Sequence, residues 1–272
     1  MRTHLSTLPF AACFAVMASL PCHAVVLASY NFEGAGDARL DSKDTDADST
    51  ASALSAGAGM GTVGNSTSTW AISGTVVGTP ARGNHMFASS VAITGTGTTP
   101  GTEEAAVANN DYFEFTFNPD SSTWSLTSLE LEFYSARTTS GTAQTSPTPE
   151  MTMFVRSSVD DFGMTLGSAT NVGLWGDTGQ AYTDADFVTL GINLASLAAY
   201  GEISAPVTFR IYMRDNFSNS TNSGWGIRMD NIELEGTMVP EPSAASLAVL
   251  GSLLLGCHRR RGARRTRPTA AG

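Results

Sequence analysis

The residues most suggestive of acid–base chemistry are two glutamates, Glu130 and Glu132, which lie two positions apart. Side chains alternate along a β-strand, so both carboxyl groups should project from one face. A glycoside hydrolase needs two carboxyl groups that flank the sugar bond. Enzymes that present their carboxylates on such a strand have a third acid there, and residues 133–136 supply none. The pair by itself therefore does not favour catalysis.

A second acidic segment contains Asp230, Glu233 and Glu235. On a regular strand Asp230 and Glu233 would lie on opposite faces, so this segment does not predict a shared site either. No phosphate loop, dinucleotide fingerprint or Gly-x-Ser-x-Gly motif is present. We therefore expect a protein that is not an enzyme.

His85 is the only histidine in residues 25–238, which excludes a zinc site built from several histidines. Any Ser-His-Asp triad would depend on this one residue. It follows a Gly-Asn pair, which is typical of turns, so we expect His85 to be a polar loop residue.

Three aspartates, Asp44, Asp46 and Asp48, occupy positions 1, 3 and 5 of a candidate calcium loop. Position 6 is Ser49, where the turn requires glycine, and position 12 is Ser55, where a bidentate glutamate belongs. A solvated acidic loop is the favoured interpretation. A weaker calcium site that also uses Asp37 and Asp41 is the alternative, and we expect no other cofactor.

Four tryptophans, at positions 70, 124, 175 and 225, are candidates for stacking on sugar rings. The best of them is Trp175, because it lies in a glycine-flanked segment with Asp177 nearby to bind hydroxyl groups. This pair predicts a carbohydrate-binding site. Packing in the core is the alternative for each tryptophan, and it is the default in a β-sandwich.

Residues 25–238 show a hydrophobic period of two and almost no helical pattern. The clearest strand covers residues 111–118, where Phe113, Phe115 and Phe117 should face the core. Similar runs cover residues 26–32, 129–134, 151–155, 188–192, 207–213 and 227–234. The pattern predicts an all-β, two-sheet antiparallel β-sandwich, most plausibly jelly-roll-like. A β-helix is the alternative, but no fixed-period repeat is present.

Two weakly patterned segments, residues 35–69 and 135–149, are predicted to be long loops or partly ordered insertions. Residues 196–200 are predicted to form a short helical turn. The three cysteines, Cys13, Cys22 and Cys257, all lie outside residues 25–238, so the predicted sandwich has no disulfide. Seven of the 15 basic residues but only one of the 25 acidic residues also lie outside it, which leaves a charge of about −16. Such a surface argues against nucleic acid as a partner.

The N-terminal segment predicts a secretory signal peptide over residues 1–24, with cleavage between Ala24 and Val25. Arg2 and His4 precede an apolar run over residues 8–20, which is too short for an ordinary membrane helix.

The C-terminal segment begins with Pro240, Glu241 and Pro242, and an apolar run over residues 243–257 follows. As a helix this run would reach about 22 Å, which predicts a single short transmembrane helix in the inner membrane. Six arginines come after it, including Arg259, Arg260 and Arg261. Their charge should hold that end on the cytoplasmic side.

The order of these features over residues 239–261 resembles the PEP-CTERM sorting signal of Gram-negative bacteria. The resemblance implies an integral-membrane exosortase and the export machinery as partners. Glu241 with its two prolines would be the recognition element, and Arg259, Arg260 and Arg261 the stop signal. The basic tail over residues 262–272 is not explained by the resemblance, and a plain membrane anchor is the alternative.

The expected function is that of an exported, non-enzymatic protein of the outer surface or the extracellular matrix, associated with exopolysaccharide. A resemblance of residues 25–238 to β-sandwich proteins that carry such signals agrees with this fold. It rests on short sequence segments such as residues 26–34 and 225–232. A carbohydrate-binding module is the first alternative, and a glycoside hydrolase or lyase is the second.

Overall fold

A computed structural model describes residues 23–33, 36–44, 46–60, 70–73, 85–89, 101–137, 150–172, 187–215 and 225–240. The strands are β1 (Val25–Tyr30), β2 (Thr50–Ala51), β3 (Ser55–Ala56), β4 (Trp70–Ser73), β5 (His85–Ser89), β6 (Tyr112–Asn118), β7 (Trp124–Arg137), β8 (Glu150–Ser157), β9 (Gly167–Val172), β10 (Val188–Asn193), β11 (Val207–Asp215) and β12 (Trp225–Met238). One α-helix, α1 (Glu103–Asn109), and several short 3-10 helices complete the described elements.

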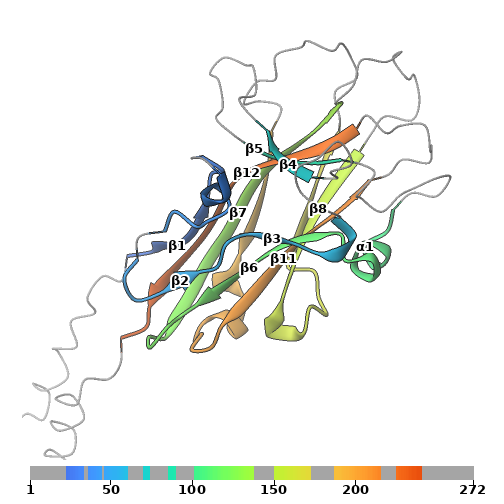
Figure 1. The fold of residues 1–272 in the computed structure, drawn as a ribbon. Coiled ribbons are helices and arrows are strands. Elements are labelled where there is room, and N and C mark those ends of the chain that lie inside the picture. The colour runs from blue at the N-terminus through green and yellow to red at the C-terminus, as the bar shows by residue number, and fades with distance from the viewer. Residues whose placement is uncertain are drawn as a thin grey trace, which may run out of the picture.

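The strands form two six-stranded antiparallel sheets that lie over each other (Figure 1). Sheet A has the order β10-β7-β12-β5-β4, and β1 also pairs with β12. Sheet B has the order β2-β6-β11-β8-β9, and β3 also pairs with β6. The predicted all-β sandwich of antiparallel sheets is therefore confirmed.

The core lies between the sheets and is built from the inward side chains of both. Phe113, Phe115 and Phe117 are at most 1 % exposed, as their alternation in the sequence predicts. Phe115 of sheet B lies 5.2 Å from the ring of Tyr30 in sheet A, measured between ring centres. Aromatic rings at this distance add to the stability gained by burial, so this pair joins the two sheets.

The helix α1 covers part of the outer face of sheet B, and the sequence pattern did not predict it (Figure 1). The Thr102 hydroxyl caps its first turn by accepting from the Ala105 N–H at 3.2 Å. Ala106 packs with Tyr112, Phe154 and Tyr212 in a second, smaller apolar cluster. Alternation along β6 pointed Tyr112 away from the core, and the helix explains why it is nevertheless buried.

Residues 36–44 and 46–60 belong to a segment predicted to be a long loop or a partly ordered insertion, and the structure shows parts of it packed against the sandwich. They contain the 3-10 helices η1 (Gly36–Arg39) and η2 (Ala58–Met60) as well as β2 and β3. Leu54 and Met60 are buried in the core, and the Tyr30 hydroxyl donates to the Ser52 carbonyl at 2.6 Å. A plain loop is therefore ruled out for the described part of this segment, and a partly ordered insertion fits it better. The hydrophobic pattern shows no sign of these elements because short edge strands and hydrogen bonds to β6 need no hydrophobic period.

The helical turn predicted at residues 196–200 consists of two 3-10 helices, η6 (Leu194–Ser196) and η7 (Ala198–Tyr200). The predicted loop over residues 138–149 lies outside the described residues, and residues 135–137 belong to β7. Residues 1–22 of the predicted signal peptide and the apolar run over residues 243–257 also lie outside them. Within the described chain, no helix combines the length and apolar character needed to cross a membrane.

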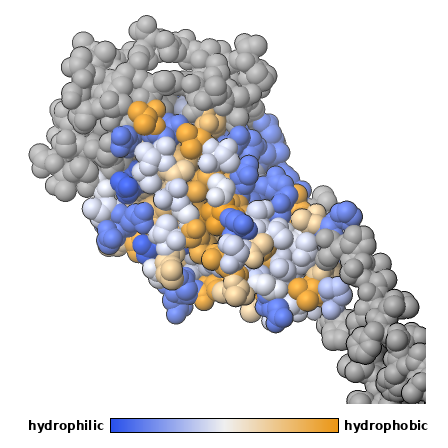
Figure 2. All heavy atoms as spheres, turned by 180° about the vertical axis from the view of Figure 1, so that it is seen from behind, coloured by the Kyte–Doolittle hydropathy of each residue, from blue (hydrophilic) through white to orange (hydrophobic). Residues whose placement is uncertain are grey.

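The surface seen in Figure 2 is mostly hydrophilic or intermediate, with a narrow central strip of hydrophobic residues. Large hydrophobic side chains with clear exposure come from separate parts of the described chain: Val25, Met164, Val172 and Leu197. Met164 is the most exposed of them, at 70 %.

Candidate functional site

Acidic side chains from β7 and β12 gather in a depression on the outer face of sheet A. Its volume is ≈ 360 Å³, and its lining consists of Ser128, Glu130, Glu132, Asn231, Glu233 and Glu235. We call this set of six residues the carboxylate groove. Glu130 and Glu132 lie on one face, as their spacing predicts. The further carboxylates come from the neighbouring strand β12, which lies about a hundred positions away in the sequence.

An irregularity in β12 brings Asp230 and Glu233 to the same face, which corrects the prediction that they lie on opposite faces. Asp230 pairs with Glu132 and Glu233 pairs with Glu130, with a register shift between the two pairs. Asn231, at this shift, has a φ of 49°. This left-handed conformation and the extra residue are features of a β-bulge. The signal in the sequence is the Asp-Asn pair, because asparagine tolerates this conformation better than most residues.

Neutral donors hold two of the four glutamates in the carboxylate groove. The Asn231 side-chain amide donates to Glu132 Oε2 at 2.7 Å, and the Ser128 hydroxyl donates to Glu235 Oε2 at 2.8 Å. The backbone N–H of Asn231 also donates to Asp230 Oδ1, at 2.9 Å. The bulge residue thus donates to one carboxylate of its own strand and to one of β7.

Burial is the main cause that raises the pKa of Glu233 above its usual value, and the negative charges of Glu235 and Glu130 add to it. Both effects favour the neutral form of the carboxyl group. The carboxyl group of Glu233 therefore takes up a proton at a higher pH than an ordinary glutamate does.

No protein-family model and no curated protein matches this chain.

Solved structures similar to this chain include two with TM-scores of 0.33 each. One is an arabinose-bound GH51 α-L-arabinofuranosidase, with 11 % identity over 78 % of this chain. The match spans only 27 % of the arabinofuranosidase chain. The other is the K1 cleaved adhesin domain of Lys-gingipain from Porphyromonas gingivalis W83, with 12 % identity over 80 % of this chain and 99 % of that chain.

The acidic loop predicted as a calcium candidate uses its carboxylates within the loop. Asp44 Oδ1 accepts from the Asp46 N–H at 2.8 Å, and Asp46 Oδ1 accepts from the Asp48 N–H at 2.9 Å. Asp46 Oδ1 also accepts from the Ser49 hydroxyl at 3.1 Å. These are the local turns that aspartate commonly forms. In the described part of the chain, no group of three or more acidic, histidine or cysteine side chains is arranged to hold a metal ion.

The other predicted residues fall in different places. Trp175 and Asp177 lie outside the described residues, as do Glu241, Pro242, Arg259, Arg260 and Arg261. Trp124 is 1 % exposed and belongs to the core. His85, predicted in a loop, is instead the first residue of β5.

The residues at the two ends of the sandwich are accessible. Ala24 is exposed directly before β1, which begins at Val25, and Pro240 is exposed just after β12.

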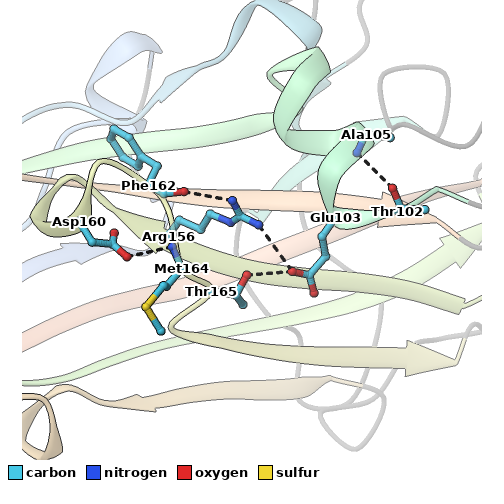
Figure 3. Close-up of polar contacts among 8 residues, drawn as sticks. All are labelled: Thr102, Glu103, Ala105, Arg156, Asp160, Phe162, Met164 and Thr165. Atoms are coloured by element: carbon cyan, nitrogen blue, oxygen red, sulfur yellow. Dashed lines mark hydrogen bonds and ion pairs between the residues drawn. The ribbon is translucent and has the colours of Figure 1, made fainter.

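A second polar cluster, centred on Arg156, fastens α1 to sheet B (Figure 3). The guanidinium of Arg156 donates to the Phe162 carbonyl at 3.0 Å and lies 3.9 Å from Glu103 Oε2. The same glutamate oxygen accepts from the Thr165 hydroxyl at 2.8 Å. Arg156 and Glu103 thus form an ion pair, and each also binds a group of the loop after β8, so the cluster links α1 to sheet B.

Proposed function

We propose that this protein is exported and sorted through its C-terminal tail, and that the β-sandwich over residues 25–238 is a non-enzymatic part that acts at the outer surface or in the extracellular matrix. The order of the triplet, the apolar run and the arginines in the sequence supports sorting by an exosortase-type enzyme.

The observation that carries the proposal is where the sandwich ends. The backbone N–H of Val239 donates to the Thr123 carbonyl at 2.8 Å, which is the last backbone hydrogen bond of the described chain. The next residue, Pro240, is exposed and cannot donate one. The triplet thus begins two residues after the end of β12. An enzyme that recognises an extended peptide can reach it without opening β12.

The position of the N-terminal end supports the same function. Val25 of β1 pairs with Gly236 of β12, so the two ends of the sandwich lie side by side. Cleavage after Ala24 would leave β1 complete, and cleavage near Pro240 would leave β12 complete. Both predicted processing events therefore fit the limits of the folded domain.

We also infer a jelly-roll topology for the sandwich. The hydrogen-bonded order β1-β12-β7-β10 in one sheet and β6-β11-β8-β9 in the other supports it. Along the chain from β6 to β12, every connection except β8–β9 passes to the opposite sheet. Two sheets joined in this way are typical of jelly rolls.

The test is mass spectrometry of both ends of the protein from the envelope and culture medium of its native host. We expect a start at Val25 and an end near Pro240 in the wild type. Replacement of Pro240, Glu241 and Pro242 by alanine should leave the chain intact to Gly272. Pro268→Ala, a proline substitution outside the triplet, is the control and should be processed normally. Normal processing of the triple variant would refute the proposal.

A further inference from the structure

The carboxylate groove places like charges opposite each other on neighbouring strands. Glu233 of β12 is the direct partner of Glu130 of β7, and Asp230 is the direct partner of Glu132. Side chains at such positions have Cβ atoms about 5 Å apart, and like charges there weaken the pairing of the strands. The described residues that line the groove include four glutamates and no basic side chain.

On the outer sides of β7 and β12, the residues of β10 and β1 that pair with the four glutamates are uncharged. On β10, Gly191 pairs with Glu130, and a Cβ built on this glycine would lie 3.9 Å from Glu130 Oε2. Thr189 of the same strand pairs with Glu132.

On the other side, β1 places Ser29 opposite Glu233 and Val26 opposite Glu235. Arg228, further along β12, lies with its guanidinium carbon 5.6 Å from the ring centre of Tyr134 and does not line the groove. The charged side chains that face Glu233 from its own strand and from β7 are therefore acidic. The strand β1 has no charged side chain, and its residue opposite Glu233 is Ser29.

We propose that the carboxylate groove makes the pairing of β1, β12 and β7 sensitive to pH, so that proton uptake by Glu233 relieves the repulsion and tightens sheet A in a mildly acidic medium. Burial and the charges of Glu235 and Glu130 raise the pKa of this group above its ordinary 4.5 in the folded chain. A raised folded-state pKa adds stability that is complete below about 4.5 and is lost as the pH rises through the folded value.

The strands concerned are those that end the sandwich. β1 is the first strand after the predicted signal peptide, and β12 leads directly to Pro240. Repulsion at Glu233 therefore acts on the pairing that holds both ends of the domain together. We expect the backbone amide protons of β1 and β12 to exchange more readily near pH 7 than near pH 5, after correction for intrinsic exchange rates.

The experiment measures urea unfolding of the full chain at about pH 5 and pH 7. For the wild type we expect a larger folding equilibrium constant at pH 5 than at pH 7. The full effect, about tenfold for each unit by which the pKa is raised, is reached only below the unfolded value of about 4.5. Glu233→Gln, which mimics the protonated side chain, should be more stable than the wild type at pH 7 and should lose most of this pH dependence. Glu202→Gln removes an exposed glutamate outside the groove and is the matched control.

The comparison between variant and wild type isolates the groove from other groups that titrate in this range. Equal pH dependence in Glu233→Gln and the wild type would overturn the proposal. If Glu233→Gln does not fold, Glu130→Gln takes its place and should reduce the pH dependence. The same pH dependence of stability in Glu130→Gln as in the wild type would then overturn the proposal. The pH dependence of amide exchange must also appear in β1 and β12. A pH dependence confined to sheet B would contradict the proposal.

Discussion

The left-handed conformation of Asn231 leads to a prediction in which the sign of an effect identifies the backbone geometry. The test compares Asn231→Gly with Asn231→Ala. Both variants lose the hydrogen bond from the Asn231 amide to Glu132, which for an exposed pair contributes roughly 0.5–1.5 kcal/mol. The difference between them therefore reports on the backbone, because neither side chain can replace this bond.

The magnitude follows from the φ of 49° at this position. An L-residue with a Cβ loses about 1–2 kcal/mol in the left-handed region, and glycine does not. Glycine loses roughly 0.4–1 kcal/mol through the greater freedom of its unfolded chain. Asn231→Ala should therefore be less stable than Asn231→Gly, by about 1 kcal/mol. In a regular strand the order is reversed, because glycine there is about 0.5–1 kcal/mol worse than alanine.

The assay is the urea dependence of unfolding for both variants in the full chain, with equal slopes as the condition for comparing their midpoints. If Asn231→Ala is as stable as Asn231→Gly or more stable, then β12 has no bulge at this residue. Asp230 and Glu233 would then lie on opposite faces, and the carboxylate groove would lose its geometric basis.

Two further predictions concern α1 and the contact between β1 and β12. Thr102→Ala removes the cap of α1 and should lower the free energy of unfolding by about 1 kcal/mol, whereas Thr102→Ser should change it little; equal losses in urea unfolding would contradict the cap. In Gly236→Ala the new Cβ would lie 2.6 Å from Leu27 Cδ1 and 3.0 Å from the Ser125 carbonyl oxygen. Overpacking of this kind costs about 1–3 kcal/mol and should raise amide exchange in β1, so unchanged exchange there would argue against the close approach.

The sequence predicts the strands whose inner faces are hydrophobic. Phe113, Phe115 and Phe117 alternate with more polar residues, and this alternation is a direct consequence of burial on one side of a sheet. Elements that contribute few buried side chains have no such signal. The helix α1 buries only Ala106 among its seven residues, so it shows no stripe that a periodicity could reveal.

Only the β7 part of the carboxylate groove was predictable from the sequence. The shared face of Glu130 and Glu132 follows from their spacing within one strand. Their partners depend on the pairing of β7 with β12 and on its register, which the local pattern of either strand does not contain. The one local clue is the Asp-Asn pair at 230–231, whose second residue tolerates a positive φ.

The strand β12 carries residues of the carboxylate groove and also leads to the C-terminal tail. Among the described strands it pairs with β7, β1 and β5, so it has neighbours on both sides for most of its length. A central strand frays less readily than an edge strand, because opening it breaks hydrogen bonds on both sides at once. Pro240, the first residue of the triplet, is exposed and follows this strand, so the proposed processing enzyme could act on the tail while the sandwich stays folded. The carboxylate groove weakens the pairing of the same strand through like charges. The stability of the strand to which the tail is attached should therefore depend on pH.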